Sequence, residues 1–287
     1  MSALAARRDA TLFAGSAYDP TAAGGLIAWQ RPGGVALLRR GSNDETLPGT
    51  HPALGGGRIA WREADEIVVA DADSLRNRQR HAAPGAGVIA VSGELLAWRT
   101  RDAAGTDRIF IQAGGEQPRL LLESPAPQEL GRPALRNGRL LCHVAGPAGS
   151  RVYSVDVATG RRITLRRERG AMLSNPSTDG ERLLYVHATG RAQELRVGSL
   201  EPGDPDEDDV LLEHASPGRR DREAEPSRRR HRHGPRRPIK LPPRAAPGVV
   251  DTLWSTALTS SAAYVTRLHV QLGAPRSADI LSVPVAR

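Results

Sequence analysis

The clearest binding chemistry in the sequence lies in one arginine-rich tract. Residues 219–244 hold eleven Arg and Lys residues against three acidic ones, and this tract alone accounts for the formal net charge of +8. Guanidinium groups at this density can neutralise phosphates on nucleic acid or on an anionic lipid surface. The candidate anion-contacting residues are Arg228, Arg229, Arg230, Arg232, Arg236 and Arg237.

The composition around this tract favours a solvated loop over a nucleic-acid-binding module. The tract has no aromatic residue on which a base could stack, and its five prolines, from Pro226 to Pro243, exclude a helix. Residues 214–247 carry too few large apolar side chains to offset the entropy of ordering the chain. We therefore predict a disordered Arg/Pro-rich insertion at 214–247, with weak contact to anionic surfaces through residues 219–244 as the alternative.

Catalytic motifs are absent from the sequence. There is no Gly-x-Ser-x-Gly nucleophile elbow, no glycine-rich phosphate loop and no His-x-x-x-His pair. Cys142 is the single cysteine, so the chain cannot form an internal disulfide. His143 follows it directly and points to the opposite face of a strand, so the two side chains cannot share a metal ion. We predict no catalytic residue and no cofactor.

An acidic stretch offers one weak metal motif. Asp204, Asp206 and Asp208 alternate as at the start of a calcium loop. The glycine and the glutamate that such a loop needs at its sixth and twelfth positions are replaced by Asp209 and Ala215. The pattern favours a solvated acidic loop, and we predict no metal site.

Short strands and the turns between them recur along the chain, and these elements would position any functional site. A short apolar strand ends in tryptophan at Leu26–Trp29, Arg58–Trp61 and Leu95–Trp98, and its later counterparts begin at Arg139, Arg182 and Ala262. A glycine-bearing turn precedes most of these strands, as expected for hairpins that need a positive φ. Several repeats also carry a proline followed by a small residue, at Pro52-Ala53, Pro133-Ala134 and Pro176-Ser177.

Short strands that repeat about every 40 residues indicate a β-propeller, in which each sheet buries its faces against its neighbours. A β-sandwich would leave the repeated order of turn and strand unexplained. We predict an all-β chain with one six-bladed β-propeller domain over residues 1–287. The expected blades lie near 20–50, 51–86, 87–131, 132–174, 175–215 and 248–287.

The last repeat lacks a fourth strand, whereas the segment 8–14 precedes the first blade and has none of its own. We predict that Asp9–Phe13 joins the last blade and closes the ring, which removes an exposed sheet edge. Phe13 is expected to pack inward. The tryptophans Trp29, Trp61 and Trp98 occupy equivalent positions and are expected to be buried.

Two repeats carry a family resemblance. Asn175–Val186 followed by Glu194–Val197 resembles the repeat of TolB-type, WD40-like propellers, and Arg132–Leu141 with Arg151–Asp156 resembles it equally. The likeness covers about residues 23–285 apart from the arginine-rich tract. It implies a bacterial, non-enzymatic protein, in a family that is usually exported or periplasmic and is known for translocation proteins with an α/β domain ahead of the propeller.

The leading functional hypothesis is a binding or scaffold protein that recognises a protein, or another ligand, on one face of the ring. The alternative is a propeller hydrolase or lyase, which would gather several carboxylates or histidines with perturbed pKa values at the channel mouth.

No apolar run approaches the roughly 20 residues that span a bilayer. The chain as given shows no export signal, so the default expectation is a cytoplasmic monomer with an unknown protein partner.

Overall fold

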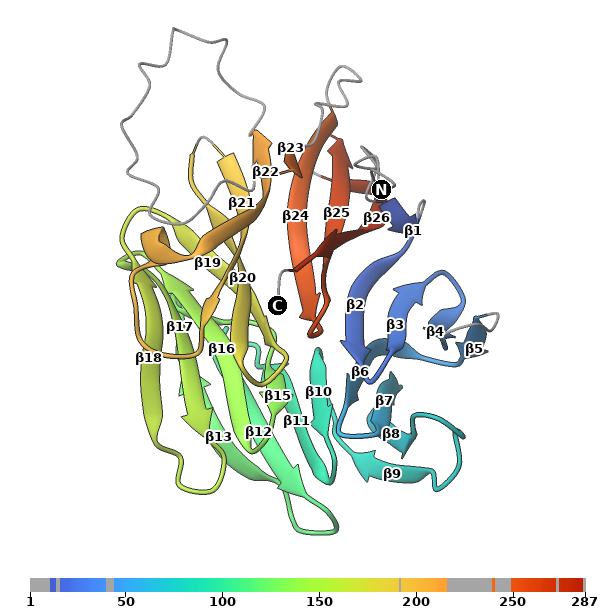
Figure 1. Cartoon of the computed structure of the whole chain (residues 1–287). Coiled ribbons are helices and arrows are strands. Elements are labelled where there is room, and N and C mark those ends of the chain that lie inside the picture. The colour runs from blue at the N-terminus through green and yellow to red at the C-terminus, as the bar shows by residue number, and fades with distance from the viewer. Residues whose placement is uncertain are drawn as a thin grey trace, which may run out of the picture.

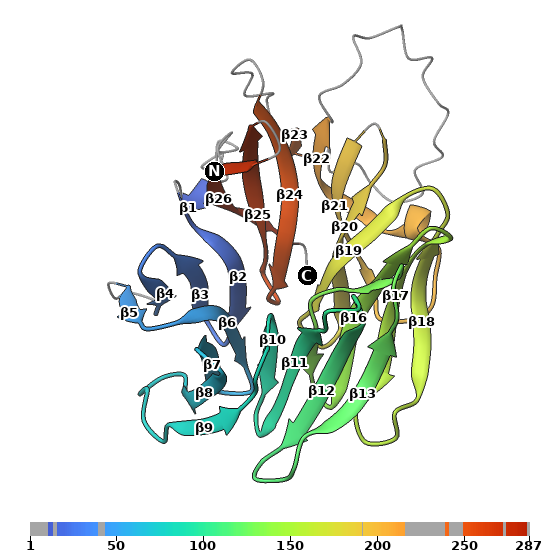
Figure 2. The same ribbon diagram turned by 180° about the vertical axis from the view of Figure 1, so that it is seen from behind.

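Six sheets surround a central axis and form a six-bladed β-propeller (Figure 1). The computed structural model describes residues 11–13, 16–39, 44–190, 192–215, 239–240, 249–271 and 274–285. Figure 2 shows the same ring from behind, with the innermost strand of each blade facing the axis. None of the helices in the described part of the chain is long and apolar enough to cross a membrane.

The first three blades each contain four antiparallel strands that run outward from the axis. Blade one consists of β2 (Tyr18–Ala23), β3 (Leu26–Arg31), β4 (Gly34–Leu38) and β5 (Glu45–Leu47). Blade two consists of β6 (Thr50–Gly55), β7 (Arg58–Glu63), β8 (Glu66–Asp71) and β9 (Gln79–Ala82). Blade three consists of β10 (Ile89–Ser92), β11 (Leu95–Arg101), β12 (Asp107–Ala113) and β13 (Arg119–Ser124).

The other three blades depart from this plan in their inner or outer strands. Blade four begins with two short strands, and comprises β14 (Glu129–Leu130), β15 (Ala134–Arg136), β16 (Arg139–Gly146), β17 (Gly149–Asp156) and β18 (Arg162–Glu168). Blade five comprises β19 (Met172–Thr178), β20 (Arg182–Ala188), β21 (Ala192–Ser199), β22 (Asp209–Ala215) and β23 (Ile239–Lys240), with the 3₁₀ helix η1 (Pro205–Glu207) before β22. Blade six comprises β24 (Val249–Leu258), β25 (Ala262–Gln271), β26 (Ala274–Pro284) and β1 (Thr11–Phe13).

The core lies between neighbouring sheets, and the three tryptophans of the repeat are part of it. Trp61 is fully buried, and Trp29 and Trp98 are each 4% exposed, which confirms the predicted burial. Trp98 stacks on Phe110 with ring centroids 5.9 Å apart. The hairpin turns behave as their sequence predicts, since Asn137 and Gly138 both take positive φ angles, of 48° and 72°.

The N-terminal strand closes the ring, as predicted. β1 pairs antiparallel with β26, and Thr11 faces Leu281 while Phe13 faces Ile280. The last blade therefore obtains its fourth strand from the opposite end of the chain, and β1 replaces β26 as the outer strand of that sheet. Residue 9 and the side chain of Phe13 lie outside the described part of the structure, so the expected inward packing of Phe13 stays a prediction.

Two short stretches of the expected insertion at 214–247 are strands, and the rest of it lies outside the described part of the structure. β22 continues to Ala215, and Ile239–Lys240 form β23, which pairs in parallel with β22. Backbone hydrogen bonding thus continues into the segment that we expected to stand apart from the blades. The inner strands of blades four and five also begin three residues before the expected borders, at Glu129 and Met172.

Candidate functional site at the mouth of the central channel

Four blades place a polar residue directly before a proline near the axis of the ring. These pairs are Asp19-Pro20, His51-Pro52, Arg132-Pro133 and Asn175-Pro176. In β2, β6 and β19 the pairing with the next strand shifts register at this point. In blade four the pair lies between β14 and β15. Such bulges turn a side chain out of the regular strand alternation, and we call the end of the channel defined by these four residues the mouth.

Three of the four residues have an uncommon backbone conformation. Asp19, His51 and Asn175 have φ angles of 54°, 53° and 50°. Left-handed backbone is rare outside glycine, and a following proline restricts the preceding residue further. Such conformations persist only where surrounding contacts determine them, and they gather at functional sites.

For His51 and Asn175 those contacts come from the preceding blade. The backbone N–H of His51 donates to Oε1 of Gln30 at 3.0 Å, and that of Asn175 donates to Nδ1 of His143 at 3.0 Å. Gln30 and His143 have the same place in the repeat, one residue after Trp29 and Cys142 respectively. The same contact between neighbouring blades thus holds the bulge of blade two to blade one and that of blade five to blade four.

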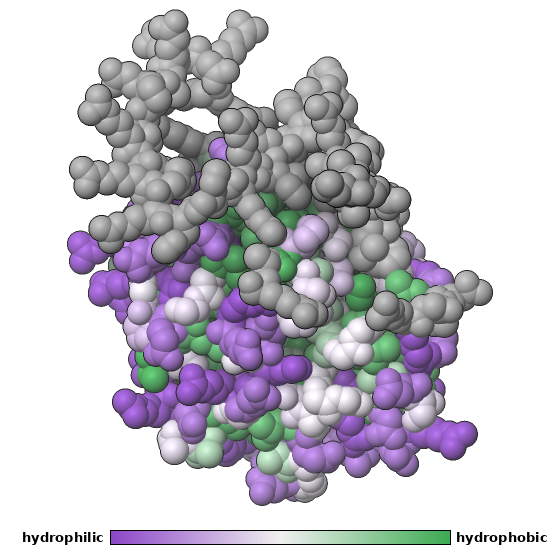
Figure 3. Space-filling view, in the orientation of Figure 1, coloured by the Kyte–Doolittle hydropathy of each residue, from purple (hydrophilic) through white to green (hydrophobic). Residues whose placement is uncertain are grey.

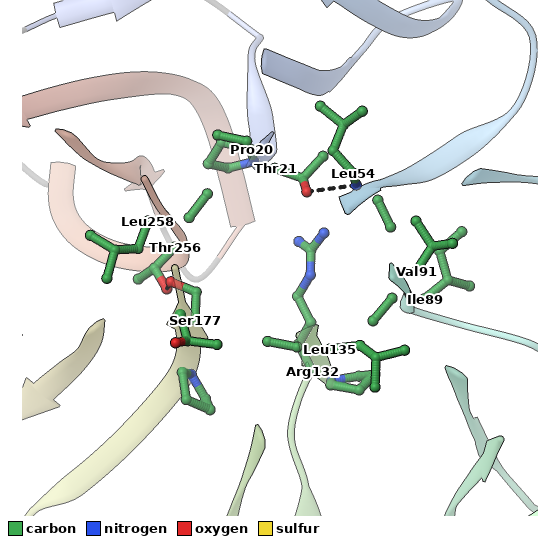
Figure 4. Close-up of a pocket in the computed structure, with 18 residues that line it drawn as sticks. Pro20, Thr21, Leu54, Ile89, Val91, Arg132, Leu135, Ser177, Thr256 and Leu258 are labelled. Atoms are coloured by element: carbon green, nitrogen blue, oxygen red, sulfur yellow. Dashed lines mark hydrogen bonds between the residues drawn. The ribbon is translucent and has the colours of Figure 1, made fainter. Parts of the chain in front are cut away.

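Arg132 extends from blade four into the middle of the channel (Figure 4). Its Nη2 donates to the carbonyl oxygen of Pro52 at 3.0 Å, and its Nη1 lies 3.2 Å from Oδ1 of Asp19. The side chains of Arg132 and Asp19 are each 12% exposed. One guanidinium therefore connects blade four with blades one and two, across the ring.

A cavity of about 60 Å³ lies around the Arg132 side chain. Every blade contributes to its wall, which includes Thr21, Leu54, Val91, Leu135, Ser177 and Thr256. Two of the contacts in this wall join neighbouring blades: the Leu54 N–H donates to Oγ1 of Thr21 at 2.9 Å, and the hydroxyls of Ser177 and Thr256 are 2.9 Å apart. Arg132 is the one charged residue among those that line the cavity.

The electrostatics of the mouth disfavour additional positive charge. Burial lowers the pKa of His51, and the positive charges of Arg132, Arg62 and Arg99 lower it further, while Asp19 acts in the opposite direction. Burial likewise lowers the pKa of His143 to about 4. Both imidazoles are therefore neutral at pH 7, and the charges that act on His51 are the Asp19 carboxylate and three guanidinium groups.

Two ionisable groups of the mouth are engaged in contacts within the ring. Asp19 is paired with Arg132, and Nδ1 of His143 is occupied by the Asn175 N–H. A general acid or base must be free to exchange its proton with a substrate, whereas these groups hold the bulges in place. No cluster of three potential metal ligands occurs among the described residues.

Blade six has an aromatic residue at the equivalent position. The register of β24 shifts between Leu253 and Thr256, and Trp254 in this bulge is 51% exposed. The Thr256 hydroxyl donates to the backbone oxygen of Asn175, which joins this bulge to that of blade five. The mouth therefore combines polar groups with one exposed tryptophan.

The acidic stretch before β22 is not a solvated loop throughout, and the prediction was wrong for Asp208. Its side chain is 4% exposed and accepts two hydrogen bonds of 2.7 Å from Arg166 and one of 2.7 Å from the Tyr185 hydroxyl. Asp204 caps η1 by accepting from the Asp206 N–H at 2.9 Å. These carboxylates therefore serve a buried ion pair between blades four and five and a helix cap.

Sequence reasoning missed the residues of the mouth. The proline of each pair was visible in three repeats, but the polar residue before it was not singled out. The usable signal was a polar residue followed by proline at the same place in several repeats. The residues that the sequence did single out, Arg228–Arg230, Arg232 and Arg236–Arg237, lie outside the described part of the structure.

No protein-family model matches the sequence, and no curated protein matches it either. Solved structures do match. The β-propeller domain of the Trilobed protease from Pyrococcus furiosus is 14% identical with a TM-score of 0.53, over 96% of this chain and 86% of that one. TolB from Acinetobacter baumannii is 13% identical with a TM-score of 0.50, over 96% of this chain and 63% of that one.

An acylaminoacyl peptidase from Pyrococcus horikoshii is 11% identical with a TM-score of 0.54, over 97% of this chain and 47% of that one. This chain thus spans less than two thirds of that peptidase and of the Acinetobacter TolB. Likeness at this identity concerns the fold, and the same fold occurs in TolB and in peptidases. In its fold, the chain is a TolB-like six-bladed β-propeller.

Proposed function

We propose that the protein is a non-enzymatic binding propeller that recognises a partner protein at the mouth of its central channel. The observation that carries the proposal is the exposed Trp254, which lies at the same place in the repeat as the buried Asp19 and Asn175 and the part-buried His51, with Arg132 at the corresponding place in blade four. Tryptophan and arginine are the side chains most enriched at binding hot spots.

The rest of the surface supports this assignment. Four large hydrophobic side chains are exposed among the described residues, namely Leu120, Ile163, Met172 and Trp254. Met172 and Trp254 belong to neighbouring inner strands, β19 and β24, whereas Leu120 and Ile163 belong to the outer strands β13 and β18. Elsewhere the visible face is largely hydrophilic, with small separate hydrophobic areas (Figure 3). Among these four side chains, Trp254 is the one whose residue type is enriched at binding hot spots.

Site-directed photo-crosslinking in an extract of the source cells tests the proposal. A photoreactive phenylalanine at position 254 is expected to give a discrete crosslinked product, and the His51→Ala/Asn175→Ala variant is expected to reduce it strongly. The matched control carries the same group at Leu120, which is 48% exposed on an outer strand. Equal products from positions 254 and 120, or none from position 254, would contradict a binding site at the mouth.

A further inference from the structure

The guanidinium of Arg132 has binding capacity that its neighbours leave unused. Nη2 donates to Pro52, but Nη1 is buried and has no hydrogen-bond partner among the described residues, although Asp19 Oδ1 lies 3.2 Å away. An arginine has five N–H donors, and leaving one unpaired in a buried place costs free energy. An acceptor that reached Arg132 from the mouth would recover that cost.

The surroundings of Arg132 carry more positive than negative charge. Arg62 donates through Nε to the carbonyl oxygen of Ala64, and Arg99 donates to that of Leu130, so neither of these two bonds neutralises its guanidinium. Asp107, which is fully buried and accepts a bond from the Leu130 N–H, forms an ion pair with Arg99 at 4.0 Å.

Three guanidiniums, those of Arg132, Arg62 and Arg99, thus stand near His51 against the carboxylates of Asp19 and Asp107. This small excess of positive charge favours an anion over a second cation at the mouth.

The cavity has room for a small anionic group. A volume of about 60 Å³ holds more than one water molecule, and a carboxylate fits such a space. The Asp19 carboxylate already lies against Arg132 from inside the ring, which shows the kind of group that this guanidinium accommodates.

We propose that the mouth binds its partner through a carboxylate side chain of an acidic peptide segment, and that Arg132 is the residue that receives it. This inference rests on the function proposed above. The planar guanidinium matches a carboxylate in geometry and keeps its charge at every physiological pH. Trp254, on the same ring of bulges, provides an apolar surface for a neighbouring residue of the peptide.

Fluorescence anisotropy with the full chain tests this inference. The probe is a fluorescein-labelled peptide in which four Glu residues flank one Trp, and its control has Gln in place of every Glu. We expect the Glu peptide to bind and the Gln peptide to bind far more weakly. Arg132→Gln is expected to weaken binding of the Glu peptide roughly tenfold or more. Equal binding of the two peptides, or an Arg132→Gln variant with unchanged affinity, would overturn the inference.

Two control variants separate the mouth from the other basic residues. Arg108→Gln removes an exposed arginine on blade three that is paired with Asp102 and Glu123, and it is expected to leave binding unchanged. Replacing Arg228, Arg229 and Arg230 together by Gln is also expected to leave the Glu peptide bound. Loss of binding in either variant would assign the peptide to a different surface.

Two further measurements complete the test. In competition, acetate should displace the peptide better than inorganic phosphate at equal ionic strength, and the reverse order would favour a phosphate ligand over a carboxylate.

NMR titration of the wild-type chain covers the case in which Arg132→Gln does not fold. The bound Glu peptide should raise the pKa of His51, since an anion nearby favours the imidazolium, and an unchanged pKa at saturation would refute the inference. Crosslinking through position 254 without any binding of the Glu peptide would refute the carboxylate inference but would not contradict the proposed function.

Discussion

Two tryptophans of this chain occupy opposite surroundings, and the difference determines what each contributes. Trp98 is 4% exposed and stacks on Phe110, whereas Trp254 is 51% exposed in the bulge of blade six. We expect Trp98→Ala to lower the free energy of unfolding by about 3–5 kcal/mol, because it empties a packed site between sheets. Urea denaturation measures the loss, and Trp254→Ala, with a small expected loss, is the matched control. Equal losses in the two variants would disprove the assigned roles.

His143 couples stability to pH through a single proton. Burial lowers its pKa to about 4, and its Nδ1 accepts the Asn175 N–H, which requires an unprotonated nitrogen there. The unfolded chain has an ordinary histidine pKa of about 6.5, so between these values the unfolded state binds more protons. The stabilising contribution is therefore complete above pH 6.5 and is lost as the pH falls toward 4.

We predict that His143→Asn, whose amide oxygen can still accept the Asn175 N–H, removes this dependence. Below pH 6.5 the free energy of unfolding of the wild type should fall more steeply than that of the variant, by up to about 1.4 kcal/mol per pH unit. Urea denaturation at pH 7, 6 and 5 provides the comparison, with His81→Asn on the outer strand β9 as control. Parallel curves for wild type and His143→Asn would show that this proton is not linked to folding.

At the scale of the elements, the ring depends on one short strand. β1 contributes only Thr11–Phe13 to the last blade, yet it covers an edge that β26 would otherwise expose. Deleting residues 1–14 is expected to lower the thermal midpoint and to promote aggregation. Deleting residues 1–8, which leaves β1 in place, is the matched control and should have little effect. A monomeric 1–14 deletion with the parent midpoint would show that this pairing does not stabilise the ring.

The elements were easier to foresee than the contacts that join them. The strands follow from a local pattern of turn, apolar residues and tryptophan, which repeats and so can be recognised within each blade. The pair of Arg166 and Asp208 joins residues 42 positions apart, and no local pattern links them. The bulges could be predicted in part. Pro52, Pro133 and Pro176 indicate where the inner strands are interrupted. The left-handed φ of His51 and Asn175 could not be predicted, because it depends on hydrogen-bond acceptors in the preceding blade.

At the scale of the whole molecule, the net charge is confined to one connection. Outside residues 219–244 the acidic and basic residues balance. We predict that replacing residues 217–247 by a short Gly/Ser linker leaves the thermal midpoint nearly unchanged, since it removes only the two-residue pairing of β23 from the described sheets. The same replacement should abolish salt-sensitive retention on heparin or anionic vesicles.

Scanning calorimetry and heparin chromatography measure these two effects. Unfolding after the replacement would show that the segment is a structural part of the ring. Heparin retention that persisted would instead place the anion-binding surface on the blades.

The closure by β1 and β26 also has a kinetic meaning. Hairpins within a blade join residues close in sequence, and such contacts form early because little chain entropy is lost. Phe13 and Ile280 come from opposite ends of the chain, so we expect their pairing to follow the stacking of the intervening blades. On this expectation, the last step of folding converts an open arc of sheets into a ring. The cross-channel contact of Arg132 with Asp19 then joins blade four to blade one, which borders that seam.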